Sequence, residues 1–236
     1  MIQISNLYKR FGKFVALNEI SLSIDRGKVM GIIGPNGSGK STLIKSILGL
    51  VRPTSGSISI DGYEINGEAD YRRRIGYMPQ LARFPQDLKG SEILGMIKKL
   101  RGANPNMEKV LIDLFELQPE LYKRIRALSG GNKQKLSIVI SSMFDPDTYI
   151  FDEPTAGLDP VSSTRLKDFI QSLKQKNKTV ILASHILSDI EELADDITLL
   201  LDGNIRFTGG VRDLKLKTGQ PLLERAIVEV LEEAAA

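Results

Sequence analysis

The sequence predicts an α/β fold in which a mostly parallel sheet is joined by an antiparallel β subdomain at the N-terminus and by an inserted α-helical subdomain. Short runs of β-branched and apolar residues alternate with longer segments of helical period, which is typical of a parallel sheet covered by helices. Strand-like runs crowd together in residues 2–24, and strand patterns disappear between residues 79 and 147. Hydrophobic residues make up 42% of the chain, so we expect one domain spanning residues 1–236.

The individual elements follow from the same patterns in chain order. Gly102, Pro105 and Pro119 divide the inserted region into separate helices, and Asp202-Gly203 predicts a hairpin turn. The predicted strands cover residues 2–7, 14–20, 22–24, 29–33, 57–60, 76–78, 148–151, 179–182 and 197–201, and the predicted helices cover 40–50, 91–100, 107–115, 133–143 and the amphipathic segment 222–231. The α/β core with its antiparallel patch then comprises residues 1–80 and 146–210, the helical subdomain 81–145 and a C-terminal helical tail 211–236.

Composition excludes several classes of function. The formal net charge is +3, and Lys and Arg are spread along the chain, so nucleic-acid binding is not indicated. The absence of cysteine excludes disulfides and thiolate metal sites. No run approaches the roughly 18 apolar residues that a membrane helix needs, and the first residues lack the apolar run of a secretory signal, so we expect a cytoplasmic protein.

A phosphate-binding loop is the strongest chemical signal. Residues 34–41 match the pattern G-x-x-x-x-G-K-[ST], between a buried strand and a helix, and therefore predict a P-loop NTPase core. The glycines let backbone N–H groups point at phosphate oxygens, and the helix N-terminus adds its dipole. Lys40 would reach the β- and γ-phosphates, and Ser41 would bind Mg²⁺. The predicted ATP-binding residues of this loop are Gly34, Pro35, Asn36, Gly37, Ser38, Gly39, Lys40, Ser41 and Thr42.

Two carboxylates complete the predicted hydrolytic site. Asp152 and Glu153 follow an apolar strand, at the strand end where open α/β sheets bind ligands. Asp152 would hold Mg²⁺, and Glu153 would polarise the attacking water. Acidic pairs after a strand are common on surfaces, but next to a P-loop this pair indicates ATP hydrolysis.

The segment Leu128-Ser129-Gly130-Gly131-Asn132 identifies the family. It resembles the L-S-G-G-Q signature of the ABC ATPases, and the resemblance extends over roughly residues 2–207. Ser129 as an N-cap, with Gly130 and Gly131 behind it, would expose N–H groups at a helix start. The resemblance implies that this tip, including Asn132, closes on the γ-phosphate held by a second subunit, in a homodimer or a heterodimer with a similar ATPase.

Further positions match the family in the expected order. The resemblance implies that Phe11 stacks on adenine, although it could instead be a core or hairpin residue. It implies that Gln80 touches Mg²⁺ and links the nucleotide site to the helical insert, and that Asp159 lies at the dimer interface. His185, the only histidine, would contact the γ-phosphate and position the water with Glu153; a local packing role is the alternative.

Two residues depart from the family pattern. Asn132 replaces the customary Gln, which shortens the side chain by one methylene but keeps an amide. Lys135 stands where the family often has Arg, so the charge remains and the bidentate fork is lost. These departures bear on hydrolysis rate or coupling and leave ATP binding intact.

A single cassette without a fused membrane domain resembles the ATPase subunit of a transporter whose permease is a separate chain. The short insert and the tail resemble the exporter-like subfamily, although the tail could equally pack on its own domain. The loop 76–85 is similar to that of ATPases in copper-site maturation of nitrous oxide reductase. The alternatives are a soluble ABC ATPase without a permease and a nucleotide-dependent interaction module that does not hydrolyse ATP. The resemblance places the subunit on the cytoplasmic face of the membrane through its permease.

Overall fold

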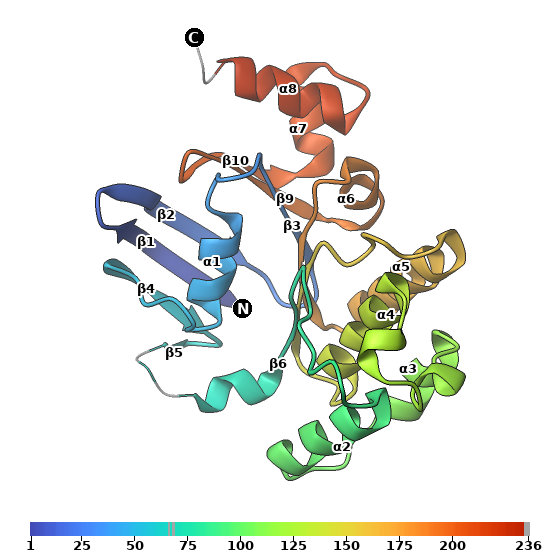
Figure 1. The fold of residues 1–236 in the computed structure, drawn as a ribbon. Coiled ribbons are helices and arrows are strands. Elements are labelled where there is room, and N and C mark those ends of the chain that lie inside the picture. Colours follow the sequence, from blue (N-terminus) through green and yellow to red (C-terminus); the bar gives the residue numbers. More distant parts are fainter. Residues whose placement is uncertain (66, 68, 234–236) are drawn as a thin grey trace.

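The computed structural model describes residues 1–65, 67 and 69–233, and its centre is a six-stranded sheet (Figure 1). The strand order is β10-β9-β3-β8-β7-β6, and only β10 is antiparallel to its neighbour. Most of these strands begin and end within a residue or two of the prediction, and all five residues of β3, β7 and β8 are buried. The strands are β3 (Val29–Ile33), β6 (Ile75–Met78), β7 (Thr148–Asp152), β8 (Thr179–Ala183), β9 (Asp196–Leu201) and β10 (Asn204–Gly210).

The N-terminal strands form a separate antiparallel sheet in the order β2-β1-β4-β5. The prediction of three short strands in residues 2–24 was wrong, because β1 and β2 are two long strands interrupted by register shifts. Asn6 and Glu19 have positive φ angles of 47° and 52° at these irregularities, which break the alternation of apolar residues. The strands are β1 (Ile2–Phe11), β2 (Phe14–Ile24), β4 (Ser55–Ile60) and β5 (Tyr63–Glu64).

Helix α1 (Lys40–Ile47) lies between the two sheets (Figure 1). Its buried residues Leu43, Ile44 and Ile47 share one apolar cluster with residues of both sheets. The helix ends at Ile47 and not at the predicted residue 50, because Gly49, directly after the C-cap Leu48, adopts φ 64°. This packing holds α1 in place, with its N-terminus at the end of the preceding strand β3.

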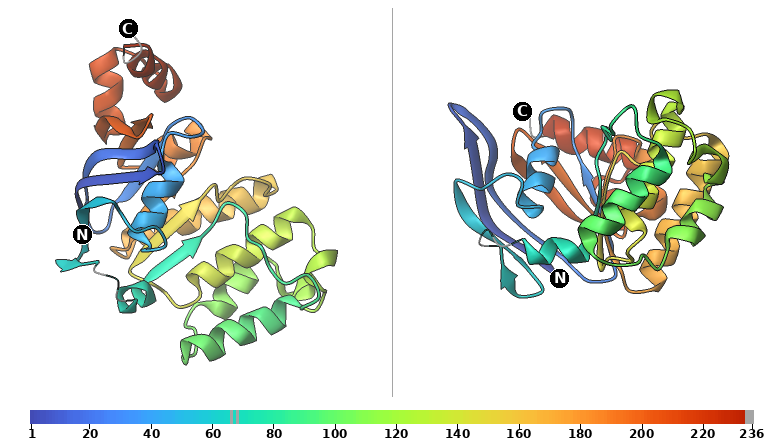
Figure 2. Two further views of the ribbon diagram at one scale, coloured as in Figure 1. Left: turned by 60° about the vertical axis from the view of Figure 1, so that its left-hand side comes forward. Right: turned by 60° about the horizontal axis from the view of Figure 1, so that its bottom comes forward.

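The helical subdomain lies on the other side of the main sheet from the N-terminal sheet (Figure 2). Its last helix begins at Gly130 and not at the predicted residue 133, because Ser129 caps it. Phe84 and Leu88 are half-buried and pack on the main apolar core. The subdomain contains α2 (Gly90–Arg101), α3 (Glu108–Leu114) and α4 (Gly130–Ser142), with short 3₁₀ turns η2 (Gln118–Glu120) and η3 (Ile125–Ala127); a further turn, η1 (Asp70–Arg74), precedes β6.

The remaining helices follow β7, β8 and β10. The amphipathic tail forms α8, and its residues Leu223, Ala226 and Ile227 are buried in the main core, so the tail packs on its own domain as far as residue 233. Residues 234–236 of the predicted tail lie outside the described residues. These helices are α5 (Pro160–Gln175), α6 (Leu187–Leu193), α7 (Val211–Thr218) and α8 (Leu223–Glu233).

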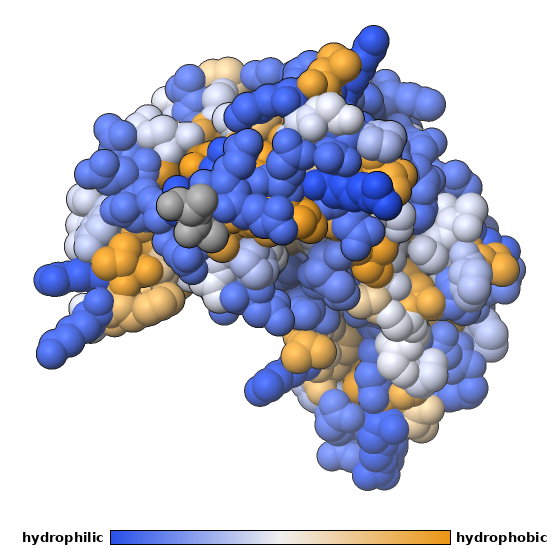
Figure 3. Space-filling model, turned by 90° about the horizontal axis from the view of Figure 1, so that it is seen from above, coloured by the Kyte–Doolittle hydropathy of each residue, from blue (hydrophilic) through white to orange (hydrophobic). Residues whose placement is uncertain are grey.

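The surface carries no extended apolar face in the view from above. It is mostly hydrophilic there, with hydrophobic residues in small separate groups (Figure 3). Across the described ranges, none of the helices combines the length and the apolar character that crossing a bilayer requires.

Candidate functional site

The loop between β3 and α1 has a backbone that only glycine permits at two points. Gly34 has φ 152°, and an added Cβ would lie 2.2 Å from the Leu200 carbonyl oxygen. Gly39 is the N-cap of α1 with φ 107°, and its Cβ would lie 2.6 Å from the Ala16 carbonyl oxygen. Side chains at these positions would force the loop away from β9 and β2, to which these carbonyls belong. The loop thus curls tightly over the N-terminus of α1.

A cavity of about 210 Å³ lies over this loop and contains most of the predicted nucleotide-site residues. Lys40 is half-buried within it, and its Nζ donates to the carbonyl oxygens of Gly34 at 2.6 Å and Pro35 at 3.0 Å. Burial lowers the pKa of Lys40, and the carboxylates of Glu153 and Asp152 oppose that shift. The lining residues are Phe14, Ala16, Asn36, Gly37, Ser38, Gly39, Lys40, Ser41, Thr42, Gln80, Asp152 and Glu153.

Three oxygen-bearing side chains that could bind Mg²⁺ share this cavity. Asp152 ends β7, Ser41 belongs to the first turn of α1, and Gln80 follows β6. Burial and the neighbouring Glu153 carboxylate raise the pKa of Asp152, while Lys40 opposes the shift. One carboxylate with neutral oxygens suits Mg²⁺ held jointly with phosphate oxygens. The residues therefore fit the predicted cofactors, ATP and Mg²⁺.

One buried donor supports a ligand in the same loop. The Ser38 hydroxyl is inaccessible and has no hydrogen-bond partner within the described part of the chain. A buried polar group without a partner is rare in folded proteins. Next to this buried hydroxyl the loop is open to a ligand, because an added Cβ at Gly37 would meet no atom within 4 Å.

Glu153 and His185 form a hydrogen-bonded pair beside the cavity. His185 Nδ1 lies 2.7 Å from Glu153 Oε2, and the His185 backbone N–H donates to Glu153 Oε1 at 3.1 Å. Glu153 is buried, whereas the imidazole is 69% exposed. The carboxylate is thereby oriented by a residue at the end of the adjacent strand β8, and the imidazole stays accessible to a ligand.

The predicted signature segment forms the tip of α4, away from this cavity. The Ser129 hydroxyl accepts a hydrogen bond from the Asn132 N–H at 3.2 Å, as expected of an N-cap. The Asn132 side chain donates to Glu120 Oε2 at 2.8 Å, a contact that the sequence did not reveal. Gly130 is exposed and Gly131 is half-buried. The tip therefore presents backbone N–H groups, as predicted, with its amide side chain bound within its own subdomain.

Asp159 and Lys135 connect this tip to the loop after β7. Asp159 caps α5 by accepting from the Ser162 N–H at 2.9 Å, and Lys135 Nζ lies 3.2 Å from its other oxygen. The hydrogen bonds from Ser162, with help from Lys135, hold the pKa of Asp159 well below its usual range. Lys135 thus keeps a charge contact without the bidentate geometry of Arg.

The predicted aromatic residue is not the one that lines the cavity. Phe11 pairs with Phe14 across the β1–β2 hairpin, and it is Phe14 that lines the cavity. Phe11 is 49% exposed and Phe14 61% exposed, and Lys9 Nζ lies 4.8 Å from the Phe11 ring centroid. The sequence signal for Phe14 was the second aromatic residue of the same short hairpin, which the prediction overlooked.

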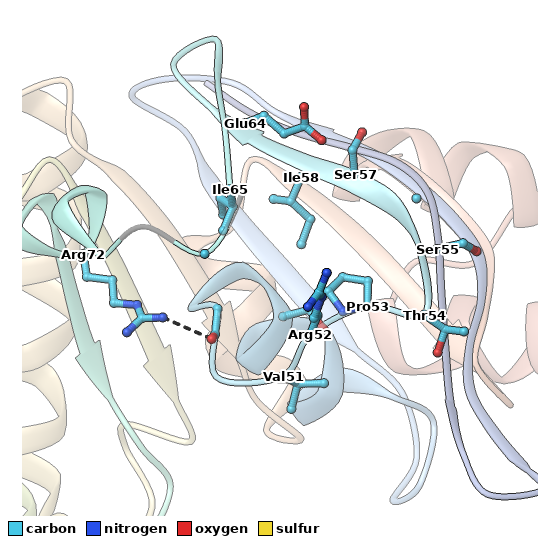
Figure 4. Close-up of a pocket in the computed structure, with 14 residues that line it drawn as sticks. Val51, Arg52, Pro53, Thr54, Ser55, Ser57, Ile58, Glu64, Ile65 and Arg72 are labelled. Carbon is cyan, nitrogen blue, oxygen red and sulfur yellow. Dashed lines mark hydrogen bonds between the residues drawn. The ribbon is translucent and has the colours of Figure 1, made fainter.

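A larger cavity of about 560 Å³ lies between the C-terminal end of α1, β4 and β5 (Figure 4). Arg72 lines it and donates from Nη2 to the Gly49 carbonyl oxygen at 3.1 Å. This contact satisfies a carbonyl at the C-terminal end of α1, where a cation is favourable. None of the predicted site residues lines this cavity, so size does not mark the functional site here.

Comparison with known proteins agrees with this geometry. The family model described as ABC transporter matches residues 17–156. The lantibiotic transport ATP-binding protein SrtF of Streptococcus pyogenes is 37% identical over 210 residues, covering 87% of this chain and 89% of that protein. The ABC transporter ATP-binding protein NatA of Bacillus subtilis is 32% identical over 225 residues, covering 91% of each chain.

Solved structures agree as well. The structure of an ATP-binding subunit of an ABC transporter superposes with a TM-score of 0.91 at 31% identity, covering 98% of this chain and 99% of that chain. The dimeric post-hydrolysis state of the cassette MJ0796 with ADP and Pi superposes with a TM-score of 0.79 at 28% identity, covering 89% and 98%. The chain therefore belongs to the ABC transporter ATP-binding family and is an ABC ATPase cassette.

Proposed function

We propose that this cassette is the ATP-hydrolysing subunit of an exporter-like transporter whose permease is a separate chain. The observation that carries hydrolysis is the Glu153–His185 pair beside the phosphate-binding loop, because an oriented, buried carboxylate can activate water next to a bound γ-phosphate. SrtF is named for lantibiotic transport, and DrrA of Streptomyces peucetius, 33% identical over 240 residues, for daunorubicin and doxorubicin resistance. These names favour export.

Each residue of the site has a proposed role. The loop N–H groups and Lys40 bind the β- and γ-phosphates, and Lys40 exchanges its carbonyl partners for phosphate oxygens. Ser41, Gln80 and Asp152 hold Mg²⁺, which would neutralise charge on the phosphates. Glu153 takes the proton of the attacking water, while the exposed imidazole of His185 contacts the γ-phosphate and positions the water together with Glu153.

The adenine base is proposed to stack on the β1–β2 hairpin. Phe11 remains the family-based candidate, and Phe14 is the aromatic residue that borders the phosphate cavity. Both rings are substantially exposed, which leaves a face open to a base. Comparing Phe11→Ala with Phe14→Ala in an ATP-binding assay assigns the stacking residue.

Two cassettes are proposed to close head to tail on two ATP molecules. Ser129, Gly130 and Gly131 of one chain, with Asn132 behind them, would complete the γ-phosphate site of the other, and Asp159 would lie at their interface. The proposal is supported by the exposed, capped tip of α4 and by the dimeric state of MJ0796. Homodimer and heterodimer with a similar ATPase both fit.

Closure is proposed to move the permease through the helical subdomain. Gln80 lies in the phosphate cavity, and next to it Leu81 is 73% exposed. The exposed surface at Leu81 would bind a short helix of the permease, and this contact would keep the cassette peripheral on the cytoplasmic face of the membrane. Phe84 and Leu88 pack on the core, so a charge there would destabilise the fold, and Leu81 is the better position for testing docking.

Copper-site maturation remains a narrower proposal that rests only on the loop 76–85. The soluble ABC ATPase and the non-hydrolysing module are the two alternatives. Co-purification with a multi-spanning membrane protein separates the first alternative from the transporter, and turnover of purified protein excludes the second.

The test of the proposed function uses Glu153→Gln, which keeps ATP and prevents its hydrolysis. We expect this variant to dimerise with Mg-ATP and to be monomeric without it, because ATP would contribute contacts to both chains. Light scattering measures the mass, and Lys40→Ala/Glu153→Gln is the matched control that should stay monomeric. A Glu153→Gln monomer at saturating Mg-ATP contradicts the shared-site model.

A further inference from the structure

Gln134 is a buried polar residue of α4 that the assigned roles do not use. It is 9% exposed, and its Nε2 donates to the carbonyl oxygens of Glu153 at 3.1 Å and Pro154 at 3.3 Å. A buried amide with two carbonyl partners is costly to replace, because its removal would leave the Glu153 carbonyl with only the Ala156 N–H at 3.3 Å and would take the Gln134 donor from the Pro154 carbonyl. Gln134 therefore holds the carbonyls of the two peptide bonds that follow the proposed catalytic residue.

The backbone that Gln134 holds is in a conformation that L-residues rarely adopt. Glu153 has φ 53°, in the left-handed region, which costs about 1 kcal/mol or more for a residue other than glycine. Its N–H donates to the Ala183 carbonyl oxygen at 2.8 Å, so β8 holds one side of the residue and Gln134 the other. Loss of the Gln134 bonds would let Glu153 relax and turn its carboxylate away from His185.

Gln134 lies on the same helix as the signature tip. Ser129 caps α4 five residues earlier, about 7.5 Å along the axis at 1.5 Å per residue. Two more contacts join the start of α4 to the loop after β7: the Lys135–Asp159 ion pair at 3.2 Å, and Gly131, whose added Cβ would lie 3.1 Å from the Gly157 carbonyl oxygen. The helix start therefore packs directly against this loop.

We propose that Gln134 is a positioning residue for hydrolysis, which connects the signature end of α4 to Glu153 of the same chain. This inference rests on the proposed function, because Ser129 is taken to contact the partner's nucleotide. When the tip of α4 is drawn toward that nucleotide, Gln134 carries the displacement to the Glu153 and Pro154 carbonyls. Each chain thus senses the partner's ATP before it hydrolyses its own.

The first experiment compares Gln134→Met with Ser141→Ala. Met keeps the length of the side chain and removes both donors. Ser141 is a buried polar residue of the same helix whose hydroxyl bonds, among the described residues, stay within α4, to Ile138 O at 3.0 Å and to the Ser142 hydroxyl at 3.3 Å. We expect Gln134→Met to lower kcat about 10-fold with nucleotide Kd unchanged, and Ser141→Ala to leave both unchanged. A Gln134→Met enzyme with wild-type kcat overturns the inference.

The second experiment tests the connection to the signature tip. In a double-mutant cycle, Ser129→Ala and Gln134→Met should not have multiplicative effects, and the double variant should turn over about as slowly as the slower single variant. Multiplicative losses would show that the two residues act separately and would overturn the proposal. The melting temperature of each variant is measured alongside, and a kcat loss that merely follows a fall in nucleotide affinity also overturns it.

Failure of this inference is distinguishable from failure of the proposed function. Glu153→Gln/Gln134→Met should still dimerise with Mg-ATP, because the contacts of the loop and of Ser129 remain. If Glu153→Gln dimerises and Gln134→Met has wild-type kcat, only the inference fails. If Gln134→Met does not fold, Gln134→Asn, which is one methylene too short for these carbonyls, serves in the same assays.

Discussion

Two helix N-termini in this molecule differ in whether a side chain caps their backbone N–H groups. At α1 the N-cap is Gly39, and no side chain within the described ranges caps the first turn. At α4 the N-cap is Ser129, whose hydroxyl already accepts the Asn132 N–H. The first N-terminus leaves its donors for a ligand, whereas the second satisfies one donor by itself.

The two N-termini also differ in what surrounds them. Around α1 the chain assembles residues from distant positions, since Lys40, Gln80 and Asp152 line one cavity. The tip of α4 consists of consecutive residues, and the partner of its Asn132 side chain, Glu120, belongs to the same subdomain. The comparison teaches that the first site is nearly complete within one chain, and we infer that the second completes a site only when it meets another chain.

The largest expected effect is that of Glu153→Gln on turnover. Removing the carboxylate that orients water should lower kcat by about 10²-fold or more and leave ATP binding intact. Steady-state turnover and nucleotide titration of the same preparation measure both quantities. Undiminished turnover in highly purified protein would mean that the hydrolytic residue lies elsewhere.

The next effect separates the two helix starts directly. Lys40→Ala should weaken ATP binding to the isolated subunit by about 10-fold or more, since it removes the cation that faces the phosphates. Ser129→Ala should leave this affinity unchanged while it impairs ATP-driven dimerisation. Titration of dilute protein with a fluorescent ATP analogue measures the affinity. Equal losses of ATP affinity in both variants would contradict the distinction between the two helix N-termini.

A smaller effect concerns the ion pairs of Asp61, which connect the N-terminal sheet to the segment before β6. Asp61 binds Arg26 Nη2 at 2.8 Å and Arg74 Nη2 at 3.0 Å, and the hydrogen bond from Arg26 holds the pKa of Asp61 well below its usual range. Asp61→Asn should cost about 1 kcal/mol of unfolding free energy at pH 7, as expected for a charge network near the surface.

The pH dependence of that cost follows from the sign of the shift. A depressed pKa stabilises the fold above the unfolded-state value, about 3.9, and this contribution disappears as the pH falls toward the folded-state value. The difference between wild type and Asp61→Asn should therefore be constant near neutrality and shrink below about pH 4. Denaturant titrations at several pH values measure it, and a difference independent of pH would exclude the ionic explanation.

The smallest expected effect concerns Asn132→Gln. The longer amide restores the family pattern and disturbs the 2.8 Å bond to Glu120, so we expect about a two- to threefold change in ATP-driven dimerisation. ATP affinity of the isolated subunit should stay the same. The matched control is Glu116→Gln, in the same subdomain as Asn132, which breaks an ion pair with Arg165 of α5. A change in the isolated subunit's affinity would show that the tip also serves the site at α1.

The elements that the sequence predicted well are those set by local patterns. The bounds of β3 match the prediction, because a short run of apolar and β-branched residues is typical of a strand buried on both faces. The loop over α1 was equally predictable, since its glycines, Lys40 and Ser41 are consecutive. The helix start at Gly130 was misplaced because two glycines, poor helix formers, open it, and Ser129 decides the boundary by capping.

By itself, the sequence determined the fold class, the phosphate-binding loop and the order of the family motifs, because each depends on residues within one strand, turn or helix. Only the tertiary structure decided that Phe14 lines the cavity, that Glu120 binds Asn132 and that Gln134 holds the Glu153 backbone. These contacts join residues from different elements. Side-chain periodicity predicts which face of an element is buried, but the packing of the sheets and helices selects which residues meet there.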